Sequence, residues 1–234
     1  MKNLKEQVAA TILAAHKVTF LTGAGVSTAS GIPDYRSLKG VYHGLEAPEY
    51  LLSHDCLLHE PAKFYQFVKH LYHPEAKPNV IHEKIAKLET EKERNVWTVS
   101  QNIDGLHEKS GSRQLVNFHG TLYQCHCRQC GQPVSWQEYL KSDRHHACGG
   151  QIRPEVVLYG EGFTQDILEQ AVAAVAQADV VVVVGTTFQV HPFCDVIHYT
   201  KVNTQSIAIN QTPVSMPVAF DMVQCAGEDI FQLL

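Results

Sequence analysis

The chain has 234 residues, of which 44% are hydrophobic, and it carries a formal net charge of −5 at pH 7. This length allows one large domain or one domain with a smaller appendage, and the hydrophobic fraction is ordinary for a globular protein. The acidic charge argues against a protein that binds nucleic acid directly, because such proteins present a basic surface.

The sequence contains no targeting or membrane signal. Residues 1–7 lack the apolar core of a signal peptide, and the longest apolar run, 171–184, is interrupted by Gln177 and Asp179 and is too short to cross a bilayer. Four of the seven cysteines lie between Cys125 and Cys148, which favours metal binding over a disulfide framework. We therefore expect a cytoplasmic protein with no membrane partner.

Apolar runs rich in β-branched residues alternate with helical patterns along the chain. Helices are predicted over residues 4–15, 80–92 and 167–178. Strands are predicted over residues 18–22, 95–100, 115–118, 155–159, 180–184, 206–209 and 222–225. The run 180–184 has no polar alternation, which is typical of a strand buried on both faces. The pattern predicts an α/β fold with a Rossmann-like parallel sheet and helices on both faces.

Two segments do not fit this sheet. Residues 37–78 predict a flexible loop followed by short helices, and residues 125–150 form a cysteine-rich insertion. We expect residues 37–78 and 123–151 to form a smaller lobe, with a helical insertion and a zinc ribbon, that closes the cleft. Residues 1–36, 79–122 and 152–234 would form the Rossmann-like domain.

Glycine or polar residues follow five of the predicted strands. They are Gly23, Gln101, His119, the run 185–187 and Asn210. In open parallel sheets ligands bind beyond the carboxyl ends of the strands, so the sequence predicts a binding cleft at this edge.

The turn Gly23-Ala24-Gly25-Val26-Ser27 would suit a nucleotide diphosphate, because glycines allow the backbone to approach phosphates. Thr28 stands where the dinucleotide fingerprint has its third glycine, so a simple tight turn is the alternative. In the next segment Tyr35 and Arg36 offer a flat ring and a guanidinium. Alone, that segment reads as a surface loop.

His119 is the best candidate for a general base, because imidazole titrates near neutral pH. The alternative is a histidine that only makes structural hydrogen bonds.

Cys127-x-x-Cys130 and His145-x-x-Cys148 are spaced as in a tetrahedral zinc site. Cys125, His126 and His146 are rival ligands, and free thiols are the alternative. Cys56, Cys194 and Cys225 resemble small core or surface residues.

In this order the motifs resemble those of the sirtuin family of NAD-dependent protein-lysine deacylases. The matching segments are 23–36, 101–107, His119-Gly120, 127–148, 153–161 and 185–187. The resemblance covers essentially the whole chain, and the ordered set of motifs is highly specific.

The resemblance implies roles for individual residues. The NAD site would be lined by Ala24, Thr28, Tyr35, Arg36, Gln101, Ile103, Asp104, Thr186, Thr187 and Asn210, with Cys225 or Ala226 near the adenine. Within this set Gln101 would contact the nicotinamide ribose, while Ile103 and Asp104 would hold the carboxamide and Asn102 would support the catalytic region. The acyl-lysine tunnel would be bordered by Val156, Val157, Gly160 and Glu161.

The implied reaction is removal of an acyl group from lysine, with nicotinamide and O-acyl-ADP-ribose as products. His119 would act as general base on the ribose hydroxyls. Zinc, held by Cys127, Cys130, His145 and Cys148, would have a structural role only, because four protein ligands leave no open position.

Three departures from the family pattern shape the expectations. His145 replaces the third zinc cysteine, and imidazole still suits zinc. Tyr65 is followed three residues later by Val68 instead of the arginine of desuccinylases, which favours acetyl or another neutral acyl group. The chain has no long terminal extension, so we expect no regulatory domain and a monomer that acts on acetylated proteins or peptides.

Two other functions remain open from the sequence. One is mono-ADP-ribosyl transfer from NAD, and the other is a zinc-ribbon interaction module on an inert scaffold. A dehydrogenase is disfavoured because no convincing acidic residue ends a strand about 20 residues after Gly25. We expect NAD to order the loop 37–48.

Overall fold

A computed structural model gives the fold of the chain and describes residues 3–33 and 47–234. The larger of its two sheets has six strands, and all neighbouring strands in it are parallel. Their spatial order is β3 (Leu115–Asn117), β2 (Asn95–Ser100), β1 (Lys17–Thr22), β7 (Val180–Val184), β8 (Gln205–Asn210) and β9 (Asp221–Gln224). The predicted α/β fold with a parallel sheet is confirmed.

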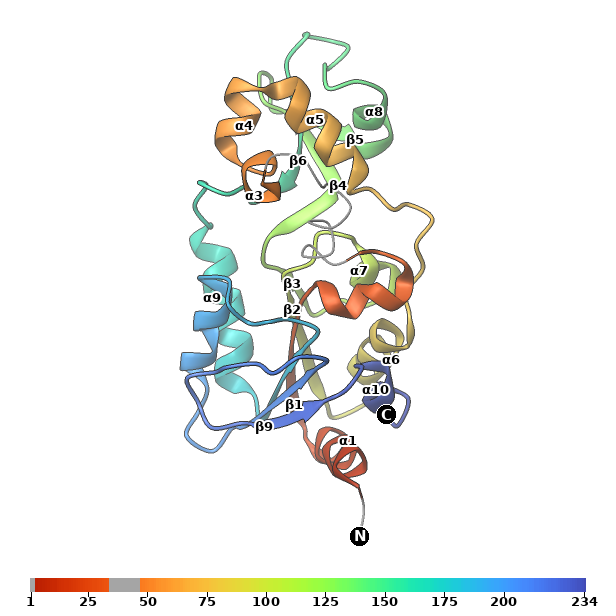
Figure 1. Cartoon of the computed structure of the whole chain (residues 1–234), viewed down its shortest axis with the longest axis vertical. Helices are drawn as coiled ribbons and strands as arrows, with labels where there is room; N and C mark the ends of the chain where they lie inside the picture. The colour runs from red at the N-terminus through yellow and green to blue at the C-terminus, as the bar shows by residue number, and fades with distance from the viewer. Residues whose placement is uncertain (1–2, 34–46) are drawn as a thin grey trace.

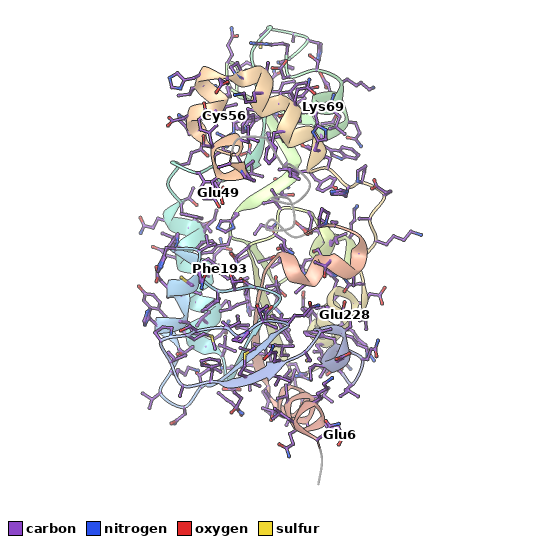
Figure 2. The ribbon with its side chains drawn as sticks, in the orientation of Figure 1. Glu6, Glu49, Cys56, Lys69, Phe193 and Glu228 are labelled. Carbon is purple, nitrogen blue, oxygen red and sulfur yellow. The ribbon has the colours of Figure 1, made fainter. Side chains whose placement is uncertain are left out.

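Helices cover both faces of this sheet, and all five residues of β7 are buried between them. One face packs against α1 (Leu4–Ala14), α6 (Val80–Glu89) and α10 (Glu228–Phe231). The other packs against α9 (Gln165–Gln177) and the 3₁₀ helix η2 (Phe193–Tyr199), beside which Phe193 is labelled in Figure 2. The three helices predicted from periodicity are α1, α6 and α9. None of the described helices is long and apolar enough to span a membrane.

A smaller lobe lies at the top of Figure 1. Its antiparallel sheet has the order β5 (Pro133–Ser135), β4 (Gly120–Cys127) and β6 (Ile152–Val156). The helices of this lobe are α3 (Pro48–Leu51), α4 (His54–His59), α5 (Pro61–His70) and α8 (Trp136–Lys141). A separate core that includes Phe64, Leu122 and Tyr139 holds the lobe together. The short helices predicted within residues 37–78 are present in the described part of that segment.

The strand predicted over residues 155–159 is correct only for Glu155 and Val156, and it does not belong to the parallel sheet. The strand in this region is β6, which ends at Val156 and belongs to the antiparallel sheet of the small lobe. The apolar run continues to Tyr159, but its backbone turns away to bond with other segments: the amide of Val157 donates to the carbonyl of His119, and that of Tyr159 to Leu52. The three-stranded sheet therefore takes residues from both sides of the boundaries predicted at 122 and 152.

Successive strands are added on one side of β1 from β1 to β3 and on its other side from β7 to β9, so the strand order reverses between β1 and β7, where open sheets form their ligand crevice. The turn after β1 leads into the 3₁₀ helix η1 (Ala24–Ser30) and packs directly on the turn after β7. The amide of Gly25 donates to the carbonyl of Gly185 at 2.8 Å, and a Cβ on Gly25 would lie 2.7 Å from that oxygen. Gly185 has φ +63°, which favours glycine. The two glycines thus allow the crevice turns to touch through their backbones.

Candidate active site

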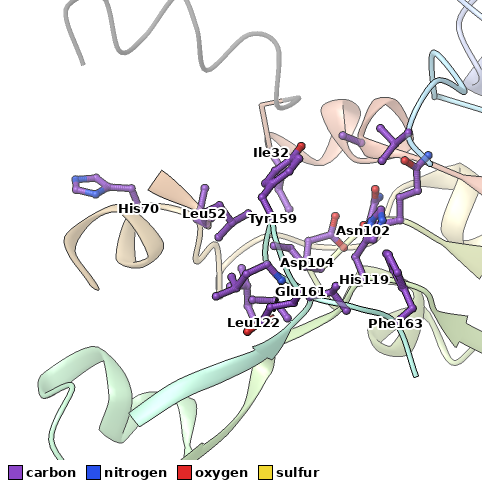
Figure 3. A pocket seen from close by; sticks show the side chains of 18 of the residues that line it. Ile32, Leu52, His70, Asn102, Asp104, His119, Leu122, Tyr159, Glu161 and Phe163 are labelled. Carbon is purple, nitrogen blue, oxygen red and sulfur yellow. Dashed lines mark hydrogen bonds between the residues drawn. The ribbon is translucent and has the colours of Figure 1, made fainter. Parts of the chain in front are cut away.

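A cavity of about 380 Å³ lies where the two lobes meet, beyond the carboxyl ends of β1 and β2. This volume is typical of small-molecule sites. The larger lobe contributes Ala24, Gln101, Asn102, Ile103, Asp104 and His119 to its wall. The small lobe and the chain that leaves it contribute Leu52, Leu122, Val156, Val157, Gly160 and Glu161, and several of both groups are labelled in Figure 3. The cavity therefore brings together residues predicted for NAD, catalysis and substrate.

His119 follows β3 and reaches the cavity from the end of that strand. Its Nδ1 lies 3.1 Å from the carbonyl oxygen of Gln101, and its ring packs against Phe118 and Phe163 with centroid separations of 5.6 Å and 5.7 Å. Burial lowers the pKa of His119, although the hydrogen bond to Gln101 partly opposes this effect. The imidazole is therefore neutral at neutral pH, as a general base must be.

The segment 101–104 is fixed by hydrogen bonds to two neighbouring strand ends. The amide of Gln101 donates to the carbonyl of Thr22, and its side-chain Nε2 donates to the hydroxyl of Thr186 at 2.8 Å. Gln101 thereby ties the turn after β2 to the turn after β7. Its side chain is held at the crevice and does not extend into solvent.

Ser27 connects Asn102 and Asp104, and the sequence did not single it out as a site residue. Asn102 Nδ2 donates to Ser27 Oγ at 3.1 Å, and that hydroxyl donates to Asp104 Oδ2 at 2.7 Å. The amide of Leu106 donates to Asp104 Oδ1 at 2.9 Å. Burial raises the pKa of Asp104, and the donors from Ser27 and Leu106 act against that increase. The serine of the Gly-Ala-Gly-x-Ser motif was the available sequence signal.

The remaining residues predicted for NAD lie along the same edge of the sheet. Thr28 is exposed on η1, and its hydroxyl donates to the carbonyl of Gly25. Asn210 ends β8, where its Nδ2 donates to Thr212 and its carbonyl accepts from the amide of Cys225 at 3.1 Å. The other four residues predicted for NAD are half-buried and follow β7 and β9: Thr186, Thr187, Cys225 and Ala226. Tyr35 and Arg36 lie outside the described residues, as does nearly all of the loop 37–48.

The segment 156–161 borders the cavity and is held by an ion pair that sequence reasoning missed. Arg153 donates to both carboxylate oxygens of Glu161 and to the carbonyl of Val156. His54 Nδ1 lies 3.0 Å from Glu161 Oε1, and the amide of Leu158 donates to Oε2. Burial opposes ionisation of Glu161, but these donors outweigh it and lower its pKa to about 2. A fixed carboxylate therefore holds the segment against α4 and β6.

The four predicted zinc ligands converge in the small lobe. The ligand atoms of Cys127, Cys130, His145 and Cys148 all lie within 4.8 Å of one another. Three of the separations are 3.3–3.5 Å, close to the roughly 3.3–3.8 Å that joins two ligands of tetrahedral zinc. A Cβ on Gly150 would lie 2.6 Å from Cys127 Sγ, so only glycine fits beside this thiol. The donor set and its geometry fit a zinc ion.

The rival ligands point to other partners. Cys125 is buried near the hydroxyl of Tyr72, at 3.6 Å. His126 Nδ1 pairs with Glu155, and His146 Nδ1 lies 2.8 Å from Glu138. None of the three belongs to the cysteine cluster among the described residues.

Comparisons with known proteins agree with this architecture. A family model described as the Sir2 family matches residues 23–192. An "NAD-dependent protein deacetylase" of Enterococcus faecalis is 59% identical over 92% of this chain and 90% of its own length. A protein of the same name from Listeria innocua is 50% identical over 99% of both chains.

Solved structures resemble the chain over almost its whole length. A Sir2 homologue in complex with NAD has a TM-score of 0.87 and 30% identity, covering 99% of this chain and 93% of its own. A Sir2 structure with deacetylated p53 peptide and 3′-O-acetyl ADP-ribose has a TM-score of 0.85 and 26% identity, with coverage of 100% and 97%.

Proposed function

The chain belongs to the Sir2 family, and from this premise we propose that it is an NAD-dependent protein-lysine deacetylase acting on acetylated proteins or peptides. The observation that carries this proposal is the cavity between the lobes, where a neutral histidine, the 101–104 segment and the 156–161 segment meet. The products would be nicotinamide, free lysine and O-acetyl-ADP-ribose.

NAD supplies the ADP-ribosyl group that accepts the acetyl group, and the residues at the edge of the sheet would bind it. Gln101, held by Thr186, would orient the ribose next to nicotinamide. Ile103 and Asp104 would hold the carboxamide, while Asn102 would keep Asp104 in place through Ser27. The adenosine half would lie along Thr186, Thr187 and Asn210, with Cys225 or Ala226 at the adenine. Ala24 and Thr28 would approach the phosphates, and the family resemblance assigns Tyr35 and Arg36 to the NAD site as well.

His119 would accept a proton from a ribose hydroxyl through Nε2. Its Nδ1 faces the carbonyl of Gln101, which can only accept a hydrogen bond, so the proton resides on Nδ1. Nε2 therefore carries the free lone pair. General-base catalysis of this kind contributes typically about 10²–10⁴-fold in rate.

Val156, Val157, Gly160 and Glu161 would border the acyl-lysine tunnel, with the peptide backbone added as a strand. The described residues that line the cavity include no lysine or arginine, and its charged members are Asp104 and Glu161. A neutral acyl group suits this lining better than an anionic one.

Zinc bound by Cys127, Cys130, His145 and Cys148 would stabilise the small lobe and take no part in the reaction. The domain division proposed from the sequence assigns this site to residues 123–151. We further propose a cytoplasmic monomer that does not bind nucleic acid directly. None of the seven cysteines, all within the described residues, forms a disulfide, which suits a reducing compartment, and the charge of −5 disfavours nucleic acid.

The test is whether nicotinamide release depends on an acetylated lysine. The protein is incubated with NAD and either an acetyl-lysine peptide or the same peptide with free lysine, and nicotinamide and deacetylated peptide are quantified. We expect equal amounts of both products with the acetylated peptide and neither with the control peptide. Asp104→Asn should reduce nicotinamide release, whereas the exposed Glu108→Gln should not. Release without acetyl-lysine, with ADP-ribose attached to protein, would replace the proposal by mono-ADP-ribosyl transfer.

A further inference from the structure

A second group of side chains with metal-binding atoms lies beside the cavity, in the larger lobe. The ligand atoms of His191, Cys194 and Asp195 lie within 4.8 Å of one another. His191 Nδ1 is 2.8 Å from Asp195 Oδ2 and 3.5 Å from Cys194 Sγ, and Sγ is 4.0 Å from Asp195 Oδ1. The proposed reaction uses none of these residues, although His191 is part of the cavity wall.

We propose that His191, Cys194 and Asp195 bind zinc or a similar divalent transition-metal ion, with water completing the coordination. Tetrahedral zinc with ligand bonds of about 2.0–2.3 Å places two ligands roughly 3.3–3.8 Å apart. The sulfur–nitrogen distance of 3.5 Å lies within this range and matches the 3.4 Å between Cys130 Sγ and His145 Nδ1 in the four-ligand cluster. The hydrogen-bonded pair of His191 and Asp195 would open by about 0.5 Å when the ion replaces the shared proton.

The charge and exposure of the three groups suit such an ion. A Cys194 thiolate, an Asp195 carboxylate and a neutral His191 together balance two positive charges. The side chains of His191 and Asp195 are 73% and 45% exposed, while Cys194 is buried beneath them. The ion would therefore be reached from solvent and would keep an open coordination position, as three-ligand zinc sites do.

The position of this site couples it to the cavity. Phe193 lies between two of the ligands in the chain, is fully buried, and packs against the rings of Phe118 and His119 at 5.3 Å and 6.4 Å. A bound ion would fix His191 and its segment against the cavity wall and hinder entry of the peptide. This inhibition rests on the proposed function, whereas binding of the ion does not.

Cobalt(II) can take the place of zinc and absorbs light when a thiolate binds it. Titration with cobalt therefore tests metal binding at His191, Cys194 and Asp195. The protein is first loaded with zinc at the four-ligand cluster, and its zinc content is measured before and after titration with cobalt. We expect one equivalent of cobalt to bind with thiolate-to-cobalt charge-transfer absorption while the zinc content stays constant. Cys194→Ser should abolish that absorption, and Asp195→Asn, an exposed substitution of nearly equal shape, should weaken cobalt binding at least about tenfold. His198→Ala, an exposed histidine on the same 3₁₀ helix, should bind cobalt as the wild type does.

Two results would overturn the site: no thiolate absorption at saturating cobalt, or equal affinity in Asp195→Asn. The inhibition is tested by adding zinc to the deacetylation assay, where half-inhibition of Asp195→Asn should need at least about tenfold more zinc than the wild type. Cobalt binding without zinc inhibition would overturn the coupling to the cavity. Absence of deacetylation in metal-free buffer would count instead against the proposed function, because it does not depend on this site.

Discussion

The carbonyl oxygen of Gln101 accepts a hydrogen bond from Nδ1 of His119 across 3.1 Å. A carbonyl cannot donate, so this contact selects the tautomer in which Nε2 is unprotonated. Burial lowers the pKa of the same ring and keeps it neutral. The turn that is proposed to bind the nicotinamide ribose therefore also holds the histidine in the form that its proposed role as a general base requires.

The lowered pKa of His119 predicts the pH dependence of the reaction. Its neutral form persists below the ordinary histidine value of about 6.5, so kcat should stay level from about pH 8 to about pH 6.5 and fall only under more acidic conditions. Initial rates at saturating NAD and peptide measure this profile. An acidic limb centred above about pH 6.5 would contradict the assignment.

Zinc retention should depend on His145 and not on its neighbour. His145→Ala should lose zinc and lower the melting temperature, because three remaining ligands cannot close the site, while His145→Cys should retain one equivalent. His146→Ala is the matched control, since His146 contacts Glu138 at the surface. Elemental analysis and thermal unfolding provide the readouts. A metal-free protein that remains fully folded would refute the structural role of zinc.

The composition of the cavity predicts slow desuccinylation. Because no lysine or arginine is among the described lining residues, kcat/KM for a succinyl-lysine peptide should be at least about tenfold below that for acetyl-lysine, or about 1.4 kcal/mol. Leu71→Arg places a cation in the lining and should narrow this ratio. Val68→Arg should unfold the small lobe instead, since Val68 is fully buried in its core. Faster desuccinylation by the wild type would disprove the preference.

Two buried histidines predict a loss of stability in mild acid. Burial lowers the pKa of His82 to about 4 and that of His107 well below its usual value, and their rings lie 4.8 Å apart. Between about pH 6.5 and pH 4 these two histidines are protonated in the unfolded chain but remain neutral in the folded chain. The free energy of unfolding therefore falls as pH falls. His82 alone should cost about 2 kcal/mol at pH 5.

Urea unfolding at about pH 7 and pH 5 measures this effect. His82→Gln should show a smaller difference between the two conditions, and the exposed His198→Ala should behave as the wild type. Equal stability of the wild type at both pH values would contradict the buried neutral state.

Four strands of the parallel sheet, β1, β2, β7 and β8, were predictable because each is a mostly buried run of largely apolar residues followed by glycine or a polar residue. The short strands β3 and β9 each bury only one residue, and only their apolar residues indicated them. The smaller sheet was not predictable. β4 contains Tyr123, Gln124 and His126 and shows no simple alternation, and β6 begins with Ile152 and an arginine. Which sheet a run joins depends on pairing with distant residues, such as Cys125 with Pro154, and local sequence does not encode that pairing.

In the candidate site, too, the sequence identified some functional residues and missed others. His119 and the 101–104 segment could be found from their positions at strand ends. Ser27 and Arg153 lie within motif segments, but the sequence did not reveal their roles, because these depend on bonds to residues 77 and 8 positions away that form only in the folded chain. Local spacing identifies groups that carry chemistry, whereas the groups that hold them in place depend on tertiary contacts.

The most direct test of the account follows the acetyl group in the wild type and in His119→Ala. Both proteins are incubated with NAD and an acetyl-lysine peptide, and mass spectrometry quantifies deacetylated peptide and O-acetyl-ADP-ribose, with circular dichroism as the folding control. We expect both products from the wild type and at least about a 10²-fold loss of both in the variant. Undiminished formation of O-acetyl-ADP-ribose by His119→Ala would contradict the central claim that His119 is the general base.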